Sequence, residues 1–225
     1  MASREDRLLK AAIDRLAAVL GLLFFSPLLL VCALAVWLED GAPIFFGQVR
    51  VGKQGRPFRL IKFRSMRSAK TGARITVSGD ARITRVGAFL RRYKLDEVPQ
   101  LFNVLKGDMS LVGPRPEVPD FVNLASPEWQ MVLAVKPGIT DLATLIYRNE
   151  EAMLGTVTDP ERHYSEVVLP AKLALSIAFI RAADLWMECK LIICTVYYSV
   201  FPRRFDVNRV RHMFSLSGPA RGYSG

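Results

Sequence analysis

The chain has 225 residues, 51% of them hydrophobic, and a formal net charge of +10. This length suits one domain with an appendage, and the charge indicates anionic partners such as phosphates, acidic lipid head groups or nucleic acid. Three cysteines and two isolated histidines provide neither a disulfide framework nor the ligand spacing of a zinc site. The mean hydropathy of +0.20 is too low for a bundle of membrane spans.

The longest apolar run, residues 16–38, contains no charged residue and is interrupted at its centre by Ser26 and Pro27. A straight helix of this length would rise about 34 Å and cross a bilayer. Pro27 has no N–H for the carbonyl of Leu23, and Ser26 can return its hydroxyl to a carbonyl one turn back. The pair therefore predicts a break, and each arm reaches only the middle of the bilayer.

Basic residues flank this run on both sides. Those before it are Arg4, Arg7, Lys10 and Arg15. Residues 50–94 hold fourteen Lys and Arg against one acid, Asp80. Because basic flanks stay in the cytoplasm, residues 1–40 are expected to form a re-entrant membrane hairpin, helix-break-helix, with Ser26 and Pro27 at the break. A Pro-kinked transmembrane span and a cleaved signal peptide are the alternatives.

The remaining elements follow from local patterns. The stretch "PIFFGQVRVGKQGRPFRLIKFRSM" predicts a β-hairpin around a Lys-Gln-Gly-Arg turn. The stretch "TRVGAFLRRYKLDEVPQLFNVLKGD" predicts two short amphipathic helices with a break between Lys94 and Asp96. Residues 169–201 are apolar with scattered charges, which suits a helix on a membrane surface or in a core. We expect an α+β, helix-rich fold: a compact domain at 41–203 with a small β-hairpin and interfacial amphipathic helices, and a flexible tail at 204–225.

Two adjacent carboxylates, Asp96 and Glu97, lie in this basic segment just before a helix with Pro99 in its first turn. Asp96 is placed as an N-cap, where backbone N–H groups and the helix dipole would keep it ionised. Such a pair can divide the work between a nucleophile and a ligand of Mg²⁺, a hard cation whose shell phosphate completes. The alternative is that Asp96 and Glu97 have no catalytic role and are acidic residues of the common kind at the N-terminus of a helix.

Several cations are placed to meet phosphate. Arg115 lies between Pro114 and Pro116, and this stiff backbone suits a bidentate grip on a diphosphate. Lys62 and Arg64 alternate on the second strand of the hairpin and so point to one face. Arg91 lies five residues before Asp96. Nucleic-acid binding is not expected, because aromatic residues are not interleaved with these cations.

The Ser-Pro-broken segment, "KFRSM", "LDEVPQLFNVLKGDMSLVGPRPE" and "KPGIT" occur in this order. Together they resemble the bacterial sugar transferase family of monotopic phosphoglycosyl transferases, over about residues 5–200. The resemblance implies an enzyme at the cytoplasmic face of a bacterial inner membrane. It would move a sugar 1-phosphate from a UDP-sugar to polyprenyl phosphate, release UMP and start polysaccharide or glycoconjugate assembly. Residues 41–203 would then be the catalytic domain.

The resemblance also assigns roles by position. Asp96 matches the catalytic nucleophile, which forms a phosphosugar-aspartyl intermediate, and Glu97 matches its catalytic partner, which coordinates Mg²⁺. The substrate-binding cations around the phosphates are matched by Lys62, Arg91 and Arg115, with Arg64 as a weaker match. Ser26 and Pro27 match the break of the membrane hairpin.

One position departs from the family pattern. Members usually continue "PGITG", whereas Asp141 follows Thr140 here, so an acid replaces a residue free to adopt positive φ. The nearby residues 148–151 form either part of a sugar pocket or, the favoured reading, a solvated helix start. The competing function is a non-enzymatic, membrane-anchored basic module that binds acidic lipid or nucleic acid. The sequence leaves the sugar, the pathway and the oligomeric state open, a homodimer included.

Overall fold

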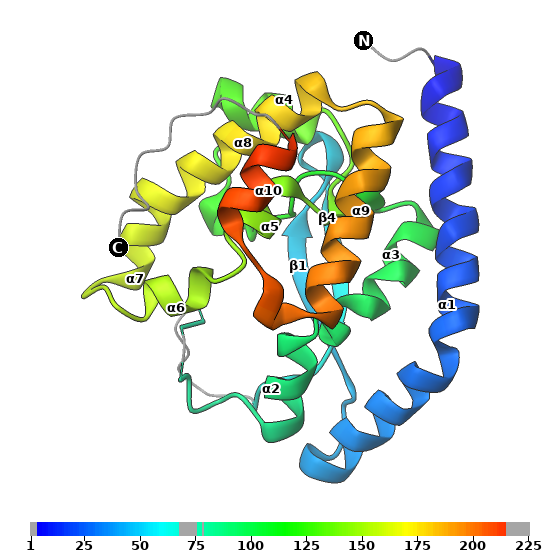
Figure 1. Cartoon of the computed structure of the whole chain (residues 1–225), viewed down its shortest axis with the longest axis vertical. Helices are drawn as coiled ribbons and strands as arrows, with labels where there is room; N and C mark the ends of the chain where they lie inside the picture. The colour runs from blue at the N-terminus through cyan, green and yellow to red at the C-terminus, as the bar shows by residue number, and fades with distance from the viewer. Residues whose placement is uncertain (1–3, 68–75, 78, 215–225) are drawn as a thin grey trace.

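The computed structural model describes residues 4–67, 76–77 and 79–214. They form a helix-rich fold with two small two-stranded sheets (Figure 1). The three long helices are α1 (Arg4–Asp40), α8 (Leu169–Ala182) and α9 (Leu185–Val200). The short helices are α2 (Arg85–Arg92), α3 (Leu101–Lys106), α4 (Pro127–Leu133), α5 (Leu142–Ile146), α6 (Glu150–Leu154), α7 (Pro160–His163) and α10 (Val207–Phe214). The strands are β1 (Phe45–Val51), β2 (Pro57–Phe63), β3 (Ser110–Val112) and β4 (Gly138–Thr140).

Helix α1 runs without interruption through Pro27, and it changes direction in its C-terminal half (Figure 1). The Ser26 hydroxyl donates to the carbonyl of Leu23 at 2.8 Å. This is the carbonyl that Pro27 cannot serve, so the Ser-Pro pair supplies its own replacement hydrogen bond. The expected separation of residues 1–40 into two helices at Ser26 and Pro27 is therefore not seen, because α1 continues through both residues.

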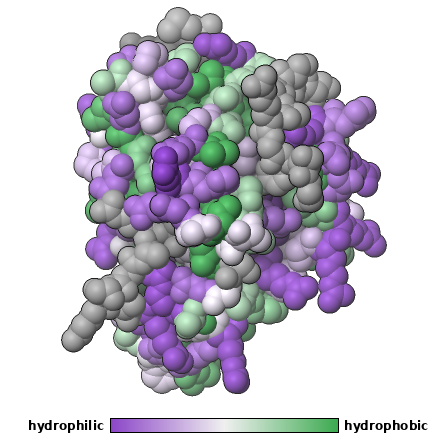
Figure 2. All heavy atoms as spheres, turned by 90° about the vertical axis from the view of Figure 1, so that its left-hand side faces the viewer, coloured by the Kyte–Doolittle hydropathy of each residue, from purple (hydrophilic) through white to green (hydrophobic). Residues whose placement is uncertain are grey.

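Helix α1 lies along one side of the molecule and leaves most of its apolar surface uncovered. Phe24, for example, is 78% exposed. Ala18 is fully buried in a cluster with Val104 and Met109, and Gly21 allows close approach because a Cβ there would meet Leu101 at 3.1 Å. Among the described residues, α1 alone is long and apolar enough to cross a membrane. Hydrophilic side chains dominate the face turned away from α1 (Figure 2).

Strands β1 and β2 form the predicted antiparallel hairpin, with a register from Phe45↔Phe63 to Val51↔Pro57. The turn between them, Lys53–Gly55, uses left-handed backbone at Gln54 and Gly55. Leu60 and Phe63 are buried, and β2 packs against the 3₁₀ helix η2 (Leu95–Gln100). The hairpin thereby becomes one wall of the region that contains Asp96.

The main core lies among α4, α5, α8, α9 and α10. Two of its members are in the segment expected to be a flexible tail: Val210 is fully buried and Phe214 is nearly so. The expectation of a flexible tail therefore fails for Val207–Phe214, which packs as α10. The remaining part of that expectation, residues 215–225, lies outside the described residues.

The apolar segment 169–201 forms two helices, because the chain leaves α8 at Ala183 and Asp184 caps α9 by accepting from the Met187 N–H at 2.7 Å. The two helices differ in what they expose. Helix α8 buries Lys172 and Ser176, whereas α9 leaves Trp186 73% exposed. Further large apolar side chains are exposed along α9: Leu185, Ile193, Val196 and Val200. This pattern is typical of a helix that is half in the core and half at an apolar boundary.

Candidate active site

Helix α2 ends just before the two carboxylates. Lys94 adopts left-handed backbone with φ 58° and ψ 22°, which redirects the chain into η2. Asp96 and Glu97 lie in the first turn of η2. The predicted break between Lys94 and Asp96 is confirmed, but Lys94 holds the N-cap position and no side chain caps the turn. The expectation that Asp96 is an N-cap is therefore wrong.

Asp96 is only 4% exposed, and its Oδ1 atom has no hydrogen-bond partner in the structure. Burial, and then the negative charge of Glu97, raise the pKa of Asp96, although the cations Lys62, Lys94 and Arg91 oppose this shift. The sequence-based expectation that backbone donors hold this carboxylate ionised is not met. A buried and unpartnered carboxylate oxygen is costly unless something binds it, so it marks this position as a candidate reactive group.

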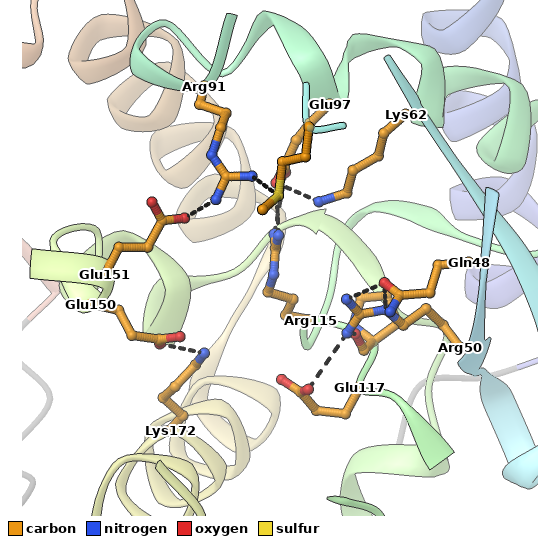
Figure 3. A network of polar contacts seen from close by, with 12 residues as sticks. Gln48, Arg50, Lys62, Arg91, Glu97, Arg115, Glu117, Glu150, Glu151 and Lys172 are labelled. Carbon is orange, nitrogen blue, oxygen red and sulfur yellow. Dashed lines mark hydrogen bonds and ion pairs between the residues drawn. The ribbon is translucent and has the colours of Figure 1, made fainter. Parts of the chain in front are cut away.

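Glu97 is held by two cations, which come from elements distant in the sequence (Figure 3). Lys62 Nζ lies 3.0 Å from Glu97 Oε1, and Arg115 donates to Oε1 at 2.7 Å and to Oε2 at 3.2 Å. Burial would raise the pKa of Glu97, but the charges of Arg115 and then Lys62 outweigh it and hold that pKa well below its usual range. The adjacent carboxylates thus have opposite pKa shifts, as acid–base and nucleophile pairs in active sites often do.

The loop that carries Arg115 is fixed by a close backbone approach. Strands β3 and β4 are parallel neighbours, with Ser110↔Gly138 and Val112↔Thr140 as partners. A Cβ at Gly138 would lie 2.1 Å from the backbone N of Gly113, so a residue with a side chain would push the two segments apart. The "GPRPE" and "KPGIT" segments therefore form one unit, which holds Arg115 opposite Glu97.

The other two predicted cations have different positions. Arg91 forms an ion pair with Glu151 and also donates to the sulfur of Met66 (Figure 3). Arg64 donates to the backbone carbonyls of Asp40, at 2.5 Å, and Gly41, at 2.7 Å. Arg64 thereby ties β2 to the C-terminal end of α1, where a cation is favoured. Lys62 and Arg64 nevertheless line the same cavity, as expected of two positions on one face, although their charged groups have different partners.

Two cavities meet at Asp96. The first has a volume of about 490 Å³ and extends toward Gln48, Arg50, Glu117, Tyr164 and Lys172. The second has a volume of about 420 Å³ and extends toward Arg92, Lys94, Arg148, Asn149 and Pro202. Both are lined by five residues: Lys62, Arg91, Asp96, Arg115 and Glu151. Four of the predicted site residues are therefore brought together, with Glu97 beside them.

A second polar network in the first cavity was not predicted. The Tyr164 hydroxyl donates to Glu117 at 2.7 Å, and Arg50 Nη1 lies 3.5 Å from the same carboxylate (Figure 3 shows the Arg50–Glu117 pair). Lys172 forms an ion pair with Glu150 at 2.8 Å. Two features of the sequence could have indicated these residues. Glu117 follows Arg115 by two positions in an extended loop, so both can point to the same side, and Lys172 is a charged residue within an apolar helix.

Glu150 and Glu151 begin α6, so the predicted helix start is present, and Glu151 is about half exposed. Both side chains also line the first cavity, where Glu150 pairs with Lys172 and Glu151 with Arg91. The departure at Asp141 also has a plain explanation. Asp141 has a φ of −144°, which any residue adopts, so positive φ is not required here. Its buried carboxylate accepts from the Ser176 hydroxyl at 3.3 Å. Asp141 therefore joins α5 to α8 in the core and does not line either cavity.

The carboxylates fit a magnesium site that substrate completes. No group of three or more His, Cys, Asp or Glu side chains suited to a metal occurs among the described residues. Mg²⁺, however, is often held by only one or two carboxylates together with substrate phosphates and water. Asp96 Oδ1 has no hydrogen-bond partner, and Glu97 Oε2 accepts one hydrogen bond, from Arg115. Both atoms are oxygen ligands of the required kind.

The family model for bacterial sugar transferases matches residues 5–202. A UDP-N-acetylgalactosamine-undecaprenyl-phosphate N-acetylgalactosaminephosphotransferase from Aeromonas hydrophila is 46% identical over 62% of this chain and 34% of its own length. An undecaprenyl-phosphate glucose phosphotransferase from Komagataeibacter xylinus is 39% identical over 89% of this chain and 37% of its own length.

A third relative, a UDP-glucose:undecaprenyl-phosphate glucose-1-phosphate transferase from Caulobacter vibrioides, is 38% identical over 83% of this chain and 68% of its own length. The chain thus spans about a third of the first two relatives and two thirds of the third. The matched residues 5–202 include the bent helix, the hairpin, Asp96, Glu97 and the arginine loop. The chain belongs to the bacterial sugar transferase family.

Proposed function

We propose that this chain is a membrane-associated phosphoglycosyl transferase that moves a sugar 1-phosphate from a UDP-sugar to a polyprenyl phosphate and releases UMP. Family membership and the names of the relatives support the reaction class. The single observation that carries the proposal is the Asp96 carboxylate, which is buried, unpartnered and situated where two cation-lined cavities meet.

In the first step, an oxygen of the Asp96 carboxylate attacks the β-phosphorus of the donor. The bond from that phosphorus to the bridging oxygen breaks, and the oxygen leaves with its electron pair as part of UMP. Arg115 and Lys62 are already fixed by Glu97, so they need little reorganisation to stabilise the charge on the phosphates. Asp96 is buried, and this exclusion of water limits hydrolysis of a covalent intermediate.

In the second step, a phosphate oxygen of the lipid attacks the same phosphorus. The bond to Asp96 breaks, and the free carboxylate and a polyprenyl diphosphate sugar result. Each step makes one P–O bond and breaks one, so no further reactant is required. Asp96 and Glu97 would hold Mg²⁺ with substrate phosphate, and the ion would supply charge neutralisation.

The membrane arrangement is part of the same proposal. The uncovered apolar surface of α1 and the exposed side chains of α9 support association with a bilayer. The basic flanks of α1 favour the cytoplasmic face of a bacterial inner membrane and a re-entrant rather than a spanning helix. The bend at Ser26–Pro27 would keep both ends of α1 on one side, and the interfacial position would bring Asp96 level with lipid phosphates. The step would begin the assembly of a polysaccharide or glycoconjugate.

The test is a panel of UDP-sugars supplied to purified full-length protein in detergent with Mg²⁺ and polyprenyl phosphate, followed by measurement of UMP. At least one donor should release UMP, and Asp96→Asn should abolish release while membrane association persists. The control is Asp120→Asn, because Asp120 lies in the short turn Pro119–Phe121 and lines neither cavity. No UMP from any donor, or full activity of Asp96→Asn, would refute the proposal.

A further inference from the structure

One carboxylate at the end of α1 is bonded to the start of α2. Glu39 Oε1 accepts from the backbone N–H of Arg85 at 2.7 Å, and Oε2 accepts from that of Val86 at 2.8 Å. These N–H groups belong to the first turn of α2, where a helix has no carbonyl of its own to bond them. Negative charge is also favoured there by the helix dipole. Glu39 therefore caps α2 from a position 46 residues earlier than Arg85.

The other contacts between the C-terminal half of α1 and α2 are apolar. Cys32 and Val36 of α1 are buried together with Leu90 of α2 and Phe63 of β2. Burial of apolar surface is non-directional, so this packing alone allows α1 to shift or turn against α2. Hydrogen bonds have defined lengths and angles. The two bonds to Glu39 therefore fix how the C-terminal half of α1 lies against α2, at the end of the molecule where the two helices meet (Figure 1).

Helix α2 does not need Glu39 in order to form, because it has a cap of its own. The Thr84 hydroxyl oxygen accepts from the Gly87 N–H at 2.9 Å. Helix α2 is also packed closely on the segment after β2, since a Cβ at Gly87 would lie 2.1 Å from the carbonyl oxygen of Ser65. Helix α2 is therefore a fixed part of the domain that contains the cavities, and Glu39 joins α1 to that domain.

The position of Glu39 in the chain connects the apolar surface with the candidate active site. Trp37 and Leu38, just before it, are 52% and 70% exposed, and aromatic residues such as Trp37 favour the membrane–water interface. The other end of α2 carries Arg91, which lines both cavities, and Asp96 follows a few residues later. Glu39 itself lines neither cavity. It therefore acts on the reaction through α2 and not by contact with substrate.

We propose that Glu39 is a positioning residue for the lipid half of the reaction: it fixes α1 against α2, and thereby the height of Asp96 above the membrane surface. This inference rests on the proposed function, because this height matters only if the acceptor is held in a bilayer. The first step uses a soluble donor, and Glu97 fixes Lys62 and Arg115 for it without any contact to α1. In the second step, the phosphate of a bilayer lipid must reach the phosphosugar on Asp96. Loss of Glu39 should therefore slow the second step selectively.

The test measures the two steps separately in full-length protein reconstituted into phosphatidylethanolamine–phosphatidylglycerol bilayers. The donor alone gives the single-turnover rate of UMP release, and the donor with long-chain polyprenyl phosphate gives kcat. Glu39→Gln keeps the shape of the side chain, but its NH₂ group is a donor and cannot accept from the second N–H of α2. Because a misplacement of about 1 Å can cost about 100-fold in rate, kcat should fall at least about tenfold, whereas single-turnover UMP release should change less than about twofold. A short-chain prenyl phosphate in detergent, which no bilayer holds, should restore turnover to within about twofold of wild type.

Arg85 offers a matched pair of variants on the α2 side of the contact. Arg85→Pro removes the N–H that donates to Glu39, and proline is favoured at this first helical position. The preceding Thr84 has φ −75° and ψ 163°, which a following proline allows. Arg85→Ala removes the same exposed side chain but keeps the N–H. Arg85→Pro should therefore behave like Glu39→Gln and add little to it in the double variant, whereas Arg85→Ala should behave like wild type.

Equal losses of single-turnover UMP release and of kcat in Glu39→Gln would show a general effect on the fold and overturn the inference. Wild-type kcat in Arg85→Pro, or an equal loss in Arg85→Ala, would overturn it as well. If wild-type protein releases no UMP, the proposed function fails, and the position of α1 is then measured directly. Spin labels are placed by Leu34→Cys and Arg92→Cys, both at exposed positions, with the exposed Cys189 replaced by serine. The distribution of distances between them should broaden in Glu39→Gln, and an unchanged distribution would overturn the positioning role.

Discussion

Glu97→Gln should destabilise the protein strongly, because the buried Glu97 compensates two cations, Lys62 and Arg115, whose side chains are only 17% and 23% exposed. Its carboxylate lies 3.0 Å from Lys62 and 2.7 Å from Arg115. The amide keeps the shape and can accept a hydrogen bond, but it leaves Lys62 and Arg115 facing each other without an intervening negative charge. Removal of one partner from a buried ion pair costs about 3–5 kcal/mol. In a domain of this size, that corresponds to a decrease of about 10 °C in the melting temperature.

The assay is thermal unfolding of detergent-solubilised protein without Mg²⁺, so that loss of metal binding does not contribute. Glu151→Gln is the matched control: it makes the same chemical change in a carboxylate that also pairs with a cation but is about half exposed. Exposed pairs contribute about 0–1 kcal/mol, so its melting temperature should fall by no more than about 4 °C. At about 2–4 °C per kcal/mol, a change of less than about 2 °C corresponds to less than about 1 kcal/mol. A melting temperature of Glu97→Gln within about 2 °C of wild type would therefore refute the reasoning.

Three further predictions follow from other parts of the fold. Burial raises the pKa of Asp141, so ionisation of this carboxyl lowers stability as pH rises from the unfolded pKa of about 3.9 through the higher folded pKa. Asp141→Asn should therefore lose less melting temperature than wild type as pH rises above about 4, and an identical pH dependence would contradict this. Pro27→Ala restores an N–H to the carbonyl of Leu23 and favours a straight helix by about 3 kcal/mol; cysteine labelling at position 42 should then show a fraction of molecules inaccessible from the cytoplasmic side, whereas wild type shows none. Val210→Asp places a charge in the core and should lower the melting temperature by more than 5 °C, on the scale of about 2–4 °C per kcal/mol, which circular dichroism would measure; no change would mean that α10 does not stabilise the core.

Local signals in the sequence predicted the local structure well. The Lys-Gln-Gly-Arg turn predicted the hairpin, and the change at Lys94 predicted the end of α2, because turn chemistry is determined by a few adjacent residues. The continuity of α1 through Pro27 was not predicted, because the Ser26 hydroxyl compensates for the lost hydrogen bond. Helix α10 was missed although Val207, Val210 and Phe214 have helical spacing, since the surrounding residues are polar.

The site was predicted in part. Asp96, Glu97, Lys62 and Arg115 do lie together, and sequence reasoning had assigned each of them to the phosphate site. Their partners could not be predicted, because ion pairs such as Arg91–Glu151 join positions sixty residues apart and depend on the packing of whole elements. The pKa shift of Asp96 was predicted in the wrong direction. The sequence-based prediction considered only the backbone N–H groups at the start of the helix. The pKa of Asp96 is instead raised by burial and by the nearby charge of Glu97, and the extent of burial depends on the complete fold.

The most direct test of the account is covalent trapping on Asp96. Full-length protein is incubated with Mg²⁺ and the UDP-sugar that gives UMP, without any lipid acceptor, and is then digested and analysed by mass spectrometry. The account predicts a peptide that carries one sugar phosphate at Asp96, one UMP released per adduct, and loss of the adduct when polyprenyl phosphate is added. UMP release without an adduct, or an adduct on any other residue, would contradict the account.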